Sequence, residues 1–380
     1  MNFHFNQDEQ DVLDMLHDFC LKEVAPIAAE IDETERFPEE TWHKLADMGM
    51  MGIAYPEEVG GAGMSYVTYI GACEELAKHC ATTSVMVSAH SSLCCWPISE
   101  YGTEAQKEKY LSKLCSGEWL GAFGLTEPGA GTDAAMQKTV AEDKGDHWVL
   151  NGSKIFITNA GFANVFVVFA MTDKSLGTKG ISAFIVERDF PGFKVGSHEK
   201  KMGIRGSSTC ELIFEDCIVP KENLLGEVGK GFKIAMTTLD GGRIGIGAQA
   251  LGIAQAAIDE CVKYTKERVQ FGKRISQFQN TQFQLADMQA KLDGARLLIY
   301  RAAQAKQDHE PYSHLAAMGK LMASEVASDV TRRALQLVGG YGYTREYPFE
   351  RFMRDAKITE IYEGTSEVQR MVISGWMGVK

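Results

Sequence analysis

The sequence predicts a protein of the α+β class, in which helical regions at both ends of the chain enclose a region of short β-strands. Through about residue 119, and again after Gly231, apolar residues recur at intervals of three and four, the spacing of one helix face. Between these regions they alternate or form short runs, as in strands. A chain of 380 residues is also too long for one ordinary core. We therefore expect three domains: an all-helical one at 1–119, a β domain at 120–227 and a helical one at 228–380.

Two apolar stripes predict helices in the first region: Val12, Leu13, Leu16, Phe19 and Cys20 form one, and Ile70, Cys73, Leu76 and Ala77 form the other. Glycines at 60, 61 and 63 should interrupt the helical segments.

Five short apolar segments predict strands in the middle region, at residues 148–150, 154–157, 165–170, 181–186 and 211–214. Asn151 and Gly152 separate the first two. Because both residue types tolerate the positive φ of a tight turn, we expect a hairpin there.

Helical periodicity returns at residues 248–268, 283–305 and 316–337. Glycines at 339, 340 and 342 and then Pro348 punctuate the last part of the chain. The outline is therefore helices, a small sheet and helices, without an internal repeat.

The composition is that of a globular protein, with 45% hydrophobic and 24% charged residues and a net charge of -12. Such an acidic balance disfavours nucleic acid and anionic membranes as partners. The nine cysteines are scattered without paired spacings, so we expect buried, reduced thiols and neither a metal site nor a disulfide framework. No leader pattern opens the chain, and no run approaches the roughly 20 apolar residues of a membrane span. We expect a cytoplasmic bacterial protein.

Glu363 is the first candidate for a catalytic group. It lies between Tyr362 and Gly364, just before a helix whose start is signalled by Ser366 and Gln369 at the spacing of a capping box. A carboxylate at such a junction can project into a cavity, where burial would raise its pKa and make it a base. The alternative is a helix-terminal glutamate paired with a nearby cation.

Other segments suit ligand contact, but each has an ordinary alternative. The glycines of residues 124–133 let backbone amides approach a ligand, although such a loop is also a common turn and lacks the spacing of a Rossmann or Walker loop. Phe156 and Thr158 share one side of a strand end, where they could contact a planar ring or simply pack. Arg243 and Arg268 could bind phosphate or be solvated or salt-bridged.

Five segments, in their order and spacing, are together highly specific: residues 125–133, 156–159, 336–342, 353–358 and 361–365. On these motifs the chain resembles the acyl-CoA dehydrogenase family from end to end, and within it the short-chain, butyryl-CoA type. The resemblance implies an N-terminal helical domain, a middle β-barrel domain and a C-terminal four-helix bundle. It also implies a homotetramer with one FAD per subunit.

The resemblance further implies the contacts of FAD. Eight positions of one subunit would contact the cofactor: Phe123, Leu125 and Thr126 at the pyrimidine side, Thr132 at phosphate, Phe156 and Thr158 at the ring, and Thr365 and Glu367 beside it. Five positions of a neighbouring subunit would contact the adenosine half: Arg268, Phe271, Gln279, Gln336 and Gly340.

By the same resemblance, Glu363 would remove the α-proton of an acyl-CoA thioester while the β-hydride passes to the flavin, giving a trans-2-enoyl-CoA. Some family members carry the base at the position of Gly242, which cannot act as one. Ser84 replaces an arginine that would bind a distal carboxylate, so a dicarboxylyl substrate is disfavoured. Ala89 replaces an acidic residue of medium-chain members, which fits a short acyl chain.

Four further positions match substrate contacts of the family: Asp240 and Arg243 near the CoA chain, and Tyr362 and Gly364 beside the base. The expected partner is an electron-transfer flavoprotein. Three alternatives stay open: enoyl-CoA reduction in an anaerobe, a branched, medium-chain or aryl-propionyl substrate, and a repurposed member of the fold such as a monooxygenase or a binding protein. An acyl-CoA oxidase is disfavoured by chain length.

Overall fold

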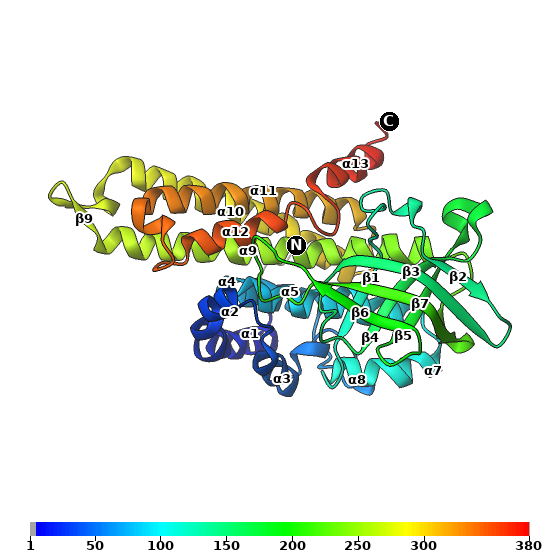
Figure 1. The fold of residues 1–380 in the computed structure, drawn as a ribbon. Helices are drawn as coiled ribbons and strands as arrows, with labels where there is room; N and C mark the ends of the chain where they lie inside the picture. Colours follow the sequence, from blue (N-terminus) through cyan, green and yellow to red (C-terminus); the bar gives the residue numbers. More distant parts are fainter. Residues whose placement is uncertain (1–4, 380) are drawn as a thin grey trace.

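The computed structural model describes residues 5–379 and confirms the α+β class. Figure 1 shows long helices that run side by side, the N-terminal helices along one side of them, and the sheet towards one end. The first region comprises α1 (Gln7–Phe19), α2 (Ala28–Thr34), α3 (Glu39–Asp47), α4 (Tyr66–His79), α5 (Ala81–Ala89), α6 (Trp96–Tyr101), α7 (Glu104–Gln106) and α8 (Ser112–Cys115).

The strands of the middle region are β1 (Gly121–Gly124), β2 (Val140–Asp143), β3 (His147–Ile157), β4 (Val165–Met171), β5 (Ile181–Glu187), β6 (Phe193–His198), β7 (Cys210–Pro220) and β8 (Leu224–Leu225). They form one sheet in the order β6-β7-β3-β2-β4-β5-β8, and β1 pairs with β4 in parallel. A single residue pair, Val140 with Met171, joins β2 to β4. The sheet is therefore two well-paired halves with a narrow connection.

The two halves curl towards each other around an aromatic core. Trp148 of β3 and Phe184 of β5 have ring centroids 5.3 Å apart, although two other strands separate them in the sheet. Phe166 of β4 and Phe193 of β6 approach to 4.8 Å in the same way. Contacts between such distant strands require a closed curvature, which agrees with the expected barrel.

The predicted hairpin at Asn151 and Gly152 is wrong. Both residues lie inside β3, where the pairing with β7 shifts register, and Gly152 has a φ of 143°. The Asn151 side-chain oxygen accepts from the backbone N–H of Asp216 at 2.8 Å, which satisfies a donor that the bulge leaves unpaired. The chain turns instead at Gly145, between β2 and β3. Two residues of β7, Glu215 and Asp216, thus lie opposite Asn151 alone, so the bulge belongs to β7 and the turn-forming pair simply continues β3.

The last region contains α9 (Gly231–Glu267), the short hairpin β9 (Val269–Gln270) and β10 (Lys273–Arg274), α10 (Gln279–Gln307), α11 (Ser313–Val338), α12 (Phe349–Ile358) and α13 (Ser366–Trp376). Helix α9 packs against α4, α10 and α11. Leu76, Leu251, Ile299 and Val330, one from each of these helices, belong to a single buried cluster. The two helical regions therefore share one hydrophobic core.

Helix gives way to strand between α8 and β1, and strand to helix between β8 and α9. We propose that the domain limits lie in these two connections, at 119/120 and 227/228. All nine cysteines are buried and none is in a disulfide, as expected. Within residues 5–379, no helix has both the length and the apolar composition needed to cross a membrane.

Candidate active site

The loop between α12 and α13 carries the candidate base, Glu363. The predicted capping box at Ser366 and Gln369 is wrong by one residue: Thr365 is the N-cap, and its side chain accepts a hydrogen bond from the first turn of α13. Gln369 is buried and points back at the loop, where its Nε2 donates to the carbonyl of Gly364 at 2.7 Å. The side chain that the capping box would use therefore holds the loop backbone.

The side chain of Glu363 is half-buried, and its carboxylate is only partly compensated by nearby positive charges. Its Oε2 is buried and has no hydrogen-bond partner among the described residues. Burial raises the pKa of Glu363 to about 7, and the nearby positive charges of Lys320 and Arg243 only partly oppose this. The backbone φ of Glu363 is 52°, a conformation that costs a non-glycine residue about 1 kcal/mol or more. An unpaired carboxylate on a strained loop is the arrangement of a proton acceptor, and the helix-terminal ion-pair alternative has no support at Oε2.

Lys320 and Gln369 hold the loop that carries the base, because both donate to its backbone. Lys320 is fully buried in α11, and its Nζ donates to the Gly364 carbonyl at 2.6 Å. Burial lowers the pKa of Lys320 to about 8. Sequence reasoning missed this lysine. The available signal was its place on the apolar face of α11, between Ala316 and Ala323, where a lysine needs a partner.

Tyr362 is anchored to the core beside the base. Its hydroxyl donates to the side-chain oxygen of Gln249 in α9. The Nε2 of Gln249 in turn donates to the carbonyl of Ala81 at 2.8 Å. This chain of hydrogen bonds ties the loop to α9 and α5, and sequence reasoning did not find Gln249.

Asp240 and Arg243 form a largely buried ion pair one turn apart on α9. Arg243 is only 4% exposed, and its Nε has no partner among the described residues. Burial lowers the pKa of Arg243, while Asp240 and then Glu363 raise it, so the guanidinium lies within electrostatic reach of the base. The structure therefore places the Asp240–Arg243 pair near the loop of Tyr362, Glu363 and Gly364, and their contact with substrate stays a prediction.

Gly242 leaves the space that the Glu363 carboxylate fills. A Cβ added to Gly242 would lie 2.0 Å from Glu363 Oε2 and 2.9 Å from the Leu93 side chain. We therefore expect Gly242→Ala to displace the carboxylate and lower the turnover rate about 100-fold, as a misplacement near 1 Å does. The matched control is Gly294→Ala in α10, where an added Cβ meets nothing within 4 Å. Steady-state kinetics should show normal activity for the control, and equal activity of both variants would contradict the assignment.

A buried ion pair fastens the glycine-rich loop to β3. Lys154 Nζ donates to Glu127 Oε1 at 2.8 Å and to the Leu125 carbonyl at 3.1 Å. Glu127 also accepts from the backbone N–H groups of Lys138 and Thr139. The loop is thus held at its base, and its tip is free. Added Cβ atoms at the tip glycines, 129 and 131, would meet nothing within 4 Å.

The surfaces beside this loop fit a planar ligand. Phe156 is 59% exposed at the end of β3, and its φ of 60° turns the ring away from the strand's regular path. Ile157 is buried, so Phe156 and Thr158 face the accessible side together. Phe123 packs edge-on against Phe169. This surface suits an aromatic cofactor with polar edges, such as a flavin, because it combines an exposed aromatic ring with hydroxyl groups and the backbone amides of an open loop.

The other predicted contacts on the same subunit are accessible in different degrees: Thr132 and Glu367 are exposed, Thr126, Thr158 and Thr365 are half-buried, and Leu125 is buried.

The positions predicted for the adenosine half lie elsewhere. Arg268 and Phe271 belong to the β9–β10 hairpin, which Figure 1 shows at the opposite end of the molecule from the sheet. Arg268 stacks over Tyr341 at 5.6 Å, which joins this hairpin to the glycine segment that contains Gly340. Phe271 is 93% exposed, and Gln279 and Gln336 are exposed as well. Within one chain the predicted cofactor contacts therefore form two separate groups.

Comparison with known proteins decides the family. Models of the acyl-CoA dehydrogenase N-terminal, middle and C-terminal domains match residues 6–118, 122–217 and 229–378. The chain belongs to the acyl-CoA dehydrogenase family. It is therefore an oxidoreductase, and the arrangement of helices, barrel and helical bundle is the fold of that family.

Short-chain acyl-CoA dehydrogenases are among its similar relatives. The short-chain specific acyl-CoA dehydrogenase of Clostridium acetobutylicum is 60% identical over 99% of both chains. The solved structure of butyryl-CoA dehydrogenase from Megasphaera elsdenii matches with a TM-score of 0.98 at 53% identity, over 99% of this chain and 100% of that one. A structure on the electron transferring flavoprotein of Acidaminococcus fermentans matches with a TM-score of 0.98 at 55% identity, over 99% of both chains.

Proposed function

We propose that this acyl-CoA dehydrogenase converts a short-chain, butyryl-CoA-like thioester to the trans-2-enoyl-CoA, with Glu363 as the base. The carrying observation is the carboxylate of Glu363, which has a pKa of about 7 and whose buried Oε2 lies in the space left by Gly242 without a hydrogen-bond partner among the described residues. FAD, when bound, supplies the acceptor for the β-hydride.

The chain's own residues prepare the proton transfer. Glu363 takes the α-proton, and its raised pKa makes this transfer less uphill than for an ordinary carboxylate. The backbone N–H of Glu363 would donate to the thioester carbonyl, where negative charge develops. Lys320 and Gln369 hold the loop, and Tyr362 closes one wall beside the base. Asp240 and Arg243 would contact the CoA chain.

FAD would lie against Phe156 and Thr158, with the loop at Leu125, Thr126 and Thr132 along its edge. Two separate groups of predicted contacts within one chain support a homotetramer in which a neighbouring subunit completes the adenosine end. The similarity to a chain of the Acidaminococcus fermentans structure supports an electron-transfer flavoprotein as the redox partner.

A short acyl chain is supported by the names of the relatives and by two buried residues of α5, Ser84 and Ala89. Ser84 is fully buried and its hydroxyl donates to the carbonyl of Cys73 at 2.8 Å, so it offers no charge to a distal carboxylate. Ala89, also buried, leaves the position of an acidic side chain apolar.

The test is anaerobic reduction of the purified holoenzyme. We expect a yellow protein whose flavin absorbance is bleached by butyryl-CoA faster than by isovaleryl-, octanoyl- or 3-phenylpropionyl-CoA. Faster bleaching by another of these thioesters would overturn the short-chain substrate. If dithionite reduces the flavin but no saturated acyl-CoA does, the proposed direction is wrong, and re-oxidation by crotonyl-CoA would identify the reductase alternative.

A further inference from the structure

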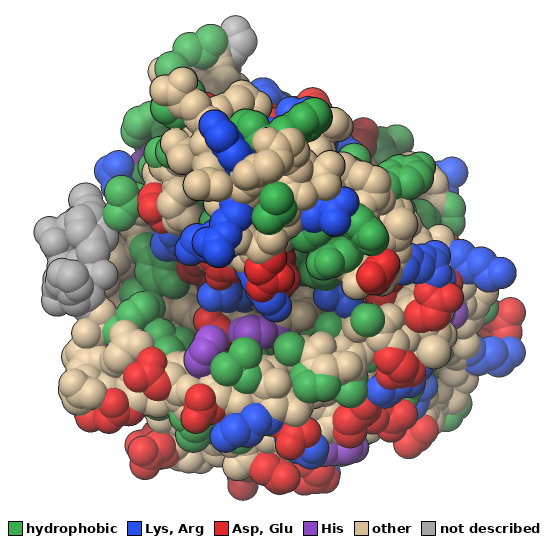
Figure 2. Space-filling model, turned by 90° about the vertical axis from the view of Figure 1, so that its left-hand side faces the viewer, with side chains coloured by type: hydrophobic (Ala, Val, Ile, Leu, Met, Phe, Trp, Pro, Cys, Tyr) green, Lys and Arg blue, Asp and Glu red, His purple; other side chains and the backbone are tan. Residues whose placement is uncertain are grey.

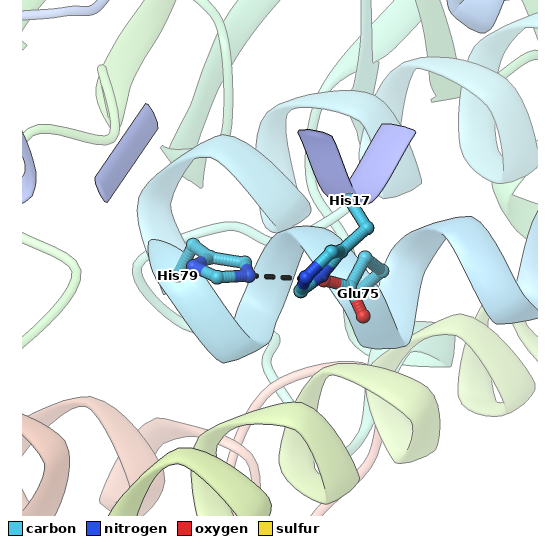
Figure 3. A group of neighbouring side chains, drawn as sticks. All are labelled: His17, Glu75 and His79. Carbon is cyan, nitrogen blue, oxygen red and sulfur yellow. Dashed lines mark hydrogen bonds and ion pairs between the residues drawn. The ribbon is translucent and has the colours of Figure 1, made fainter. Parts of the chain in front are cut away.

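His17, Glu75 and His79 form a cluster that the proposed reaction does not use. His17 comes from α1, and the other two lie one turn apart on α4. Figure 3 shows the three side chains pointing towards one another between the two helices. His17 Nδ1 lies 2.6 Å and His79 Nε2 lies 2.9 Å from the same atom, Glu75 Oε1. One ligand atom from each residue lies within 4.8 Å of the others.

The donor types and spacing suit a transition metal. Two imidazole nitrogens and one carboxylate oxygen are the protein ligands of many zinc sites, and water takes the fourth position. Zinc binds these atoms at about 2.0–2.2 Å, so three ligands of a tetrahedral site lie roughly 3.4 Å apart. The present contacts would open by less than about 1 Å to admit an ion, because the cluster already converges on one oxygen.

The charged neighbours of this cluster form ion pairs with other residues. Lys78 pairs with Asp259 at 3.0 Å, and Arg296 pairs with Glu74 at 2.8 Å. The recorded hydrogen-bond partners of the Glu75 carboxylate are the two imidazoles. No lysine or arginine ion pair therefore competes for the carboxylate within the described residues 5–379.

An ion could reach the cluster from solvent. The side chains are 44%, 21% and 10% exposed for His17, Glu75 and His79. His17 and Glu75 line a cavity of about 1120 Å³, together with Glu9, Asp14 and other polar residues. Figure 2 shows histidine side chains bordering a hollow on the surface. Partial exposure leaves room for a water ligand, and the cavity supplies an entry path.

We propose that His17, Glu75 and His79 bind a divalent transition metal of the zinc class, which cross-links α1 to α4. The sequence pattern predicts no metal site, because His17 and Glu75 are 58 positions apart and only folding joins them. None of the three is a residue assigned to the flavin or the acyl-CoA. The ion would have a structural role, added to the contact that Glu9 of α1 already makes with Ser65.

The experiment uses chelator-treated, full-length holoenzyme titrated with ZnCl₂ and, as a spectroscopic probe, CoCl₂. We expect one equivalent of zinc per chain, a higher thermal midpoint with zinc, and cobalt d–d bands without thiolate charge-transfer bands. His17→Gln and His79→Gln should each weaken zinc binding by on the order of tenfold or more, since outer partners of metal ligands alone are worth that much. Flavin bleaching by butyryl-CoA should be unchanged in both variants.

The matched control is His147→Gln, which removes another surface histidine that contacts only one carboxylate, Asp146. It should bind zinc as the parent does. Three results would overturn the site: no zinc retained by the parent, equal affinity in the parent and both cluster variants, or cobalt–thiolate bands that place the ion on cysteine. Circular dichroism of the metal-free variants should match that of the parent, and if it does not, His79→Asn in place of His79→Gln decides the same question.

Discussion

Glu363→Gln is expected to abolish nearly all turnover of butyryl-CoA, by about 1,000-fold or more, while FAD and CoA ligands stay bound. Glutamine has almost the same shape as glutamate but cannot accept the α-proton. The buried site should accept it, because Oε2 of Glu363 has no hydrogen-bond partner to lose among the described residues. Single-turnover flavin reduction measures the loss, and ligand-induced changes of the flavin spectrum measure binding.

The dependence of this rate on pH separates a base from a structural carboxylate. Burial raises the pKa of Glu363 to about 7, and the reactive form is the deprotonated one. The parent rate should therefore rise as pH increases through about 7 and then level off, whereas the residual rate of the glutamine variant should lack this rise. Stability depends on pH in the opposite direction from the rate. A raised carboxyl pKa means that the folded state binds the proton more tightly than the unfolded state, so the free energy of unfolding falls as pH rises from about 4.5 to 7. The neutral variant should escape this fall.

Glu360→Gln is the matched control, because the half-buried Glu360 lies in the same loop and already pairs with the exposed Lys357. It should retain parental turnover. Wild-type activity in Glu363→Gln, or an equal loss in both variants, would remove Glu363 from the mechanism.

Periodicity located the long helices and four of the eight strands of the middle sheet, β3, β4, β5 and β7, because burial of one face is a local property of the sequence. It succeeded for β4, all of whose residues are buried, and for the α1 stripe around Leu16. It failed at Asn151 and Gly152, because the segments on both sides of this pair bind one partner strand, β7, whose bulge lies opposite Asn151 and gives no local signal in β3. Thr365 and Ser366 are both good N-caps, and the choice between them depends on the buried Gln369.

Among the site residues, too, those with a local sequence signal were predicted and those that depend on distant contacts were not. Glu363 and its loop carry a local signal, and the family resemblance supplies the rest. Lys320, Gln249 and Lys154 were missed because each acts through a partner far away in the sequence: 44, 113 and 27 positions from its contact in the loop or strand. A buried polar side chain indicates that it has a hydrogen-bond partner, but only the tertiary structure identifies that partner.

Lys154→Met is expected to destabilise the middle domain by about 3–5 kcal/mol, because it leaves the Glu127 carboxylate buried without its cation. Lys154 is 0% and Glu127 is 5% exposed. Burial tends to raise the pKa of Glu127, but Lys154 and the backbone N–H groups more than offset it, so the pKa is lowered. Loss of the bond from Lys154 to the Leu125 carbonyl should also loosen the cofactor loop and lower FAD retention. Denaturant unfolding by circular dichroism and flavin release measures both effects.

The double variant Lys154→Met, Glu127→Gln tests whether an unpaired charge causes the loss. Glutamine keeps an acceptor for the Thr139 backbone N–H but carries no charge, so the double variant should recover about 2 kcal/mol of stability relative to Lys154→Met. Lys194→Met is the control, since Lys194 makes an exposed ion pair with Glu215 and should cost less than about 1 kcal/mol. Additive losses in the double variant would mean that packing of the lysine stem, and not the buried charge, holds the loop on β3.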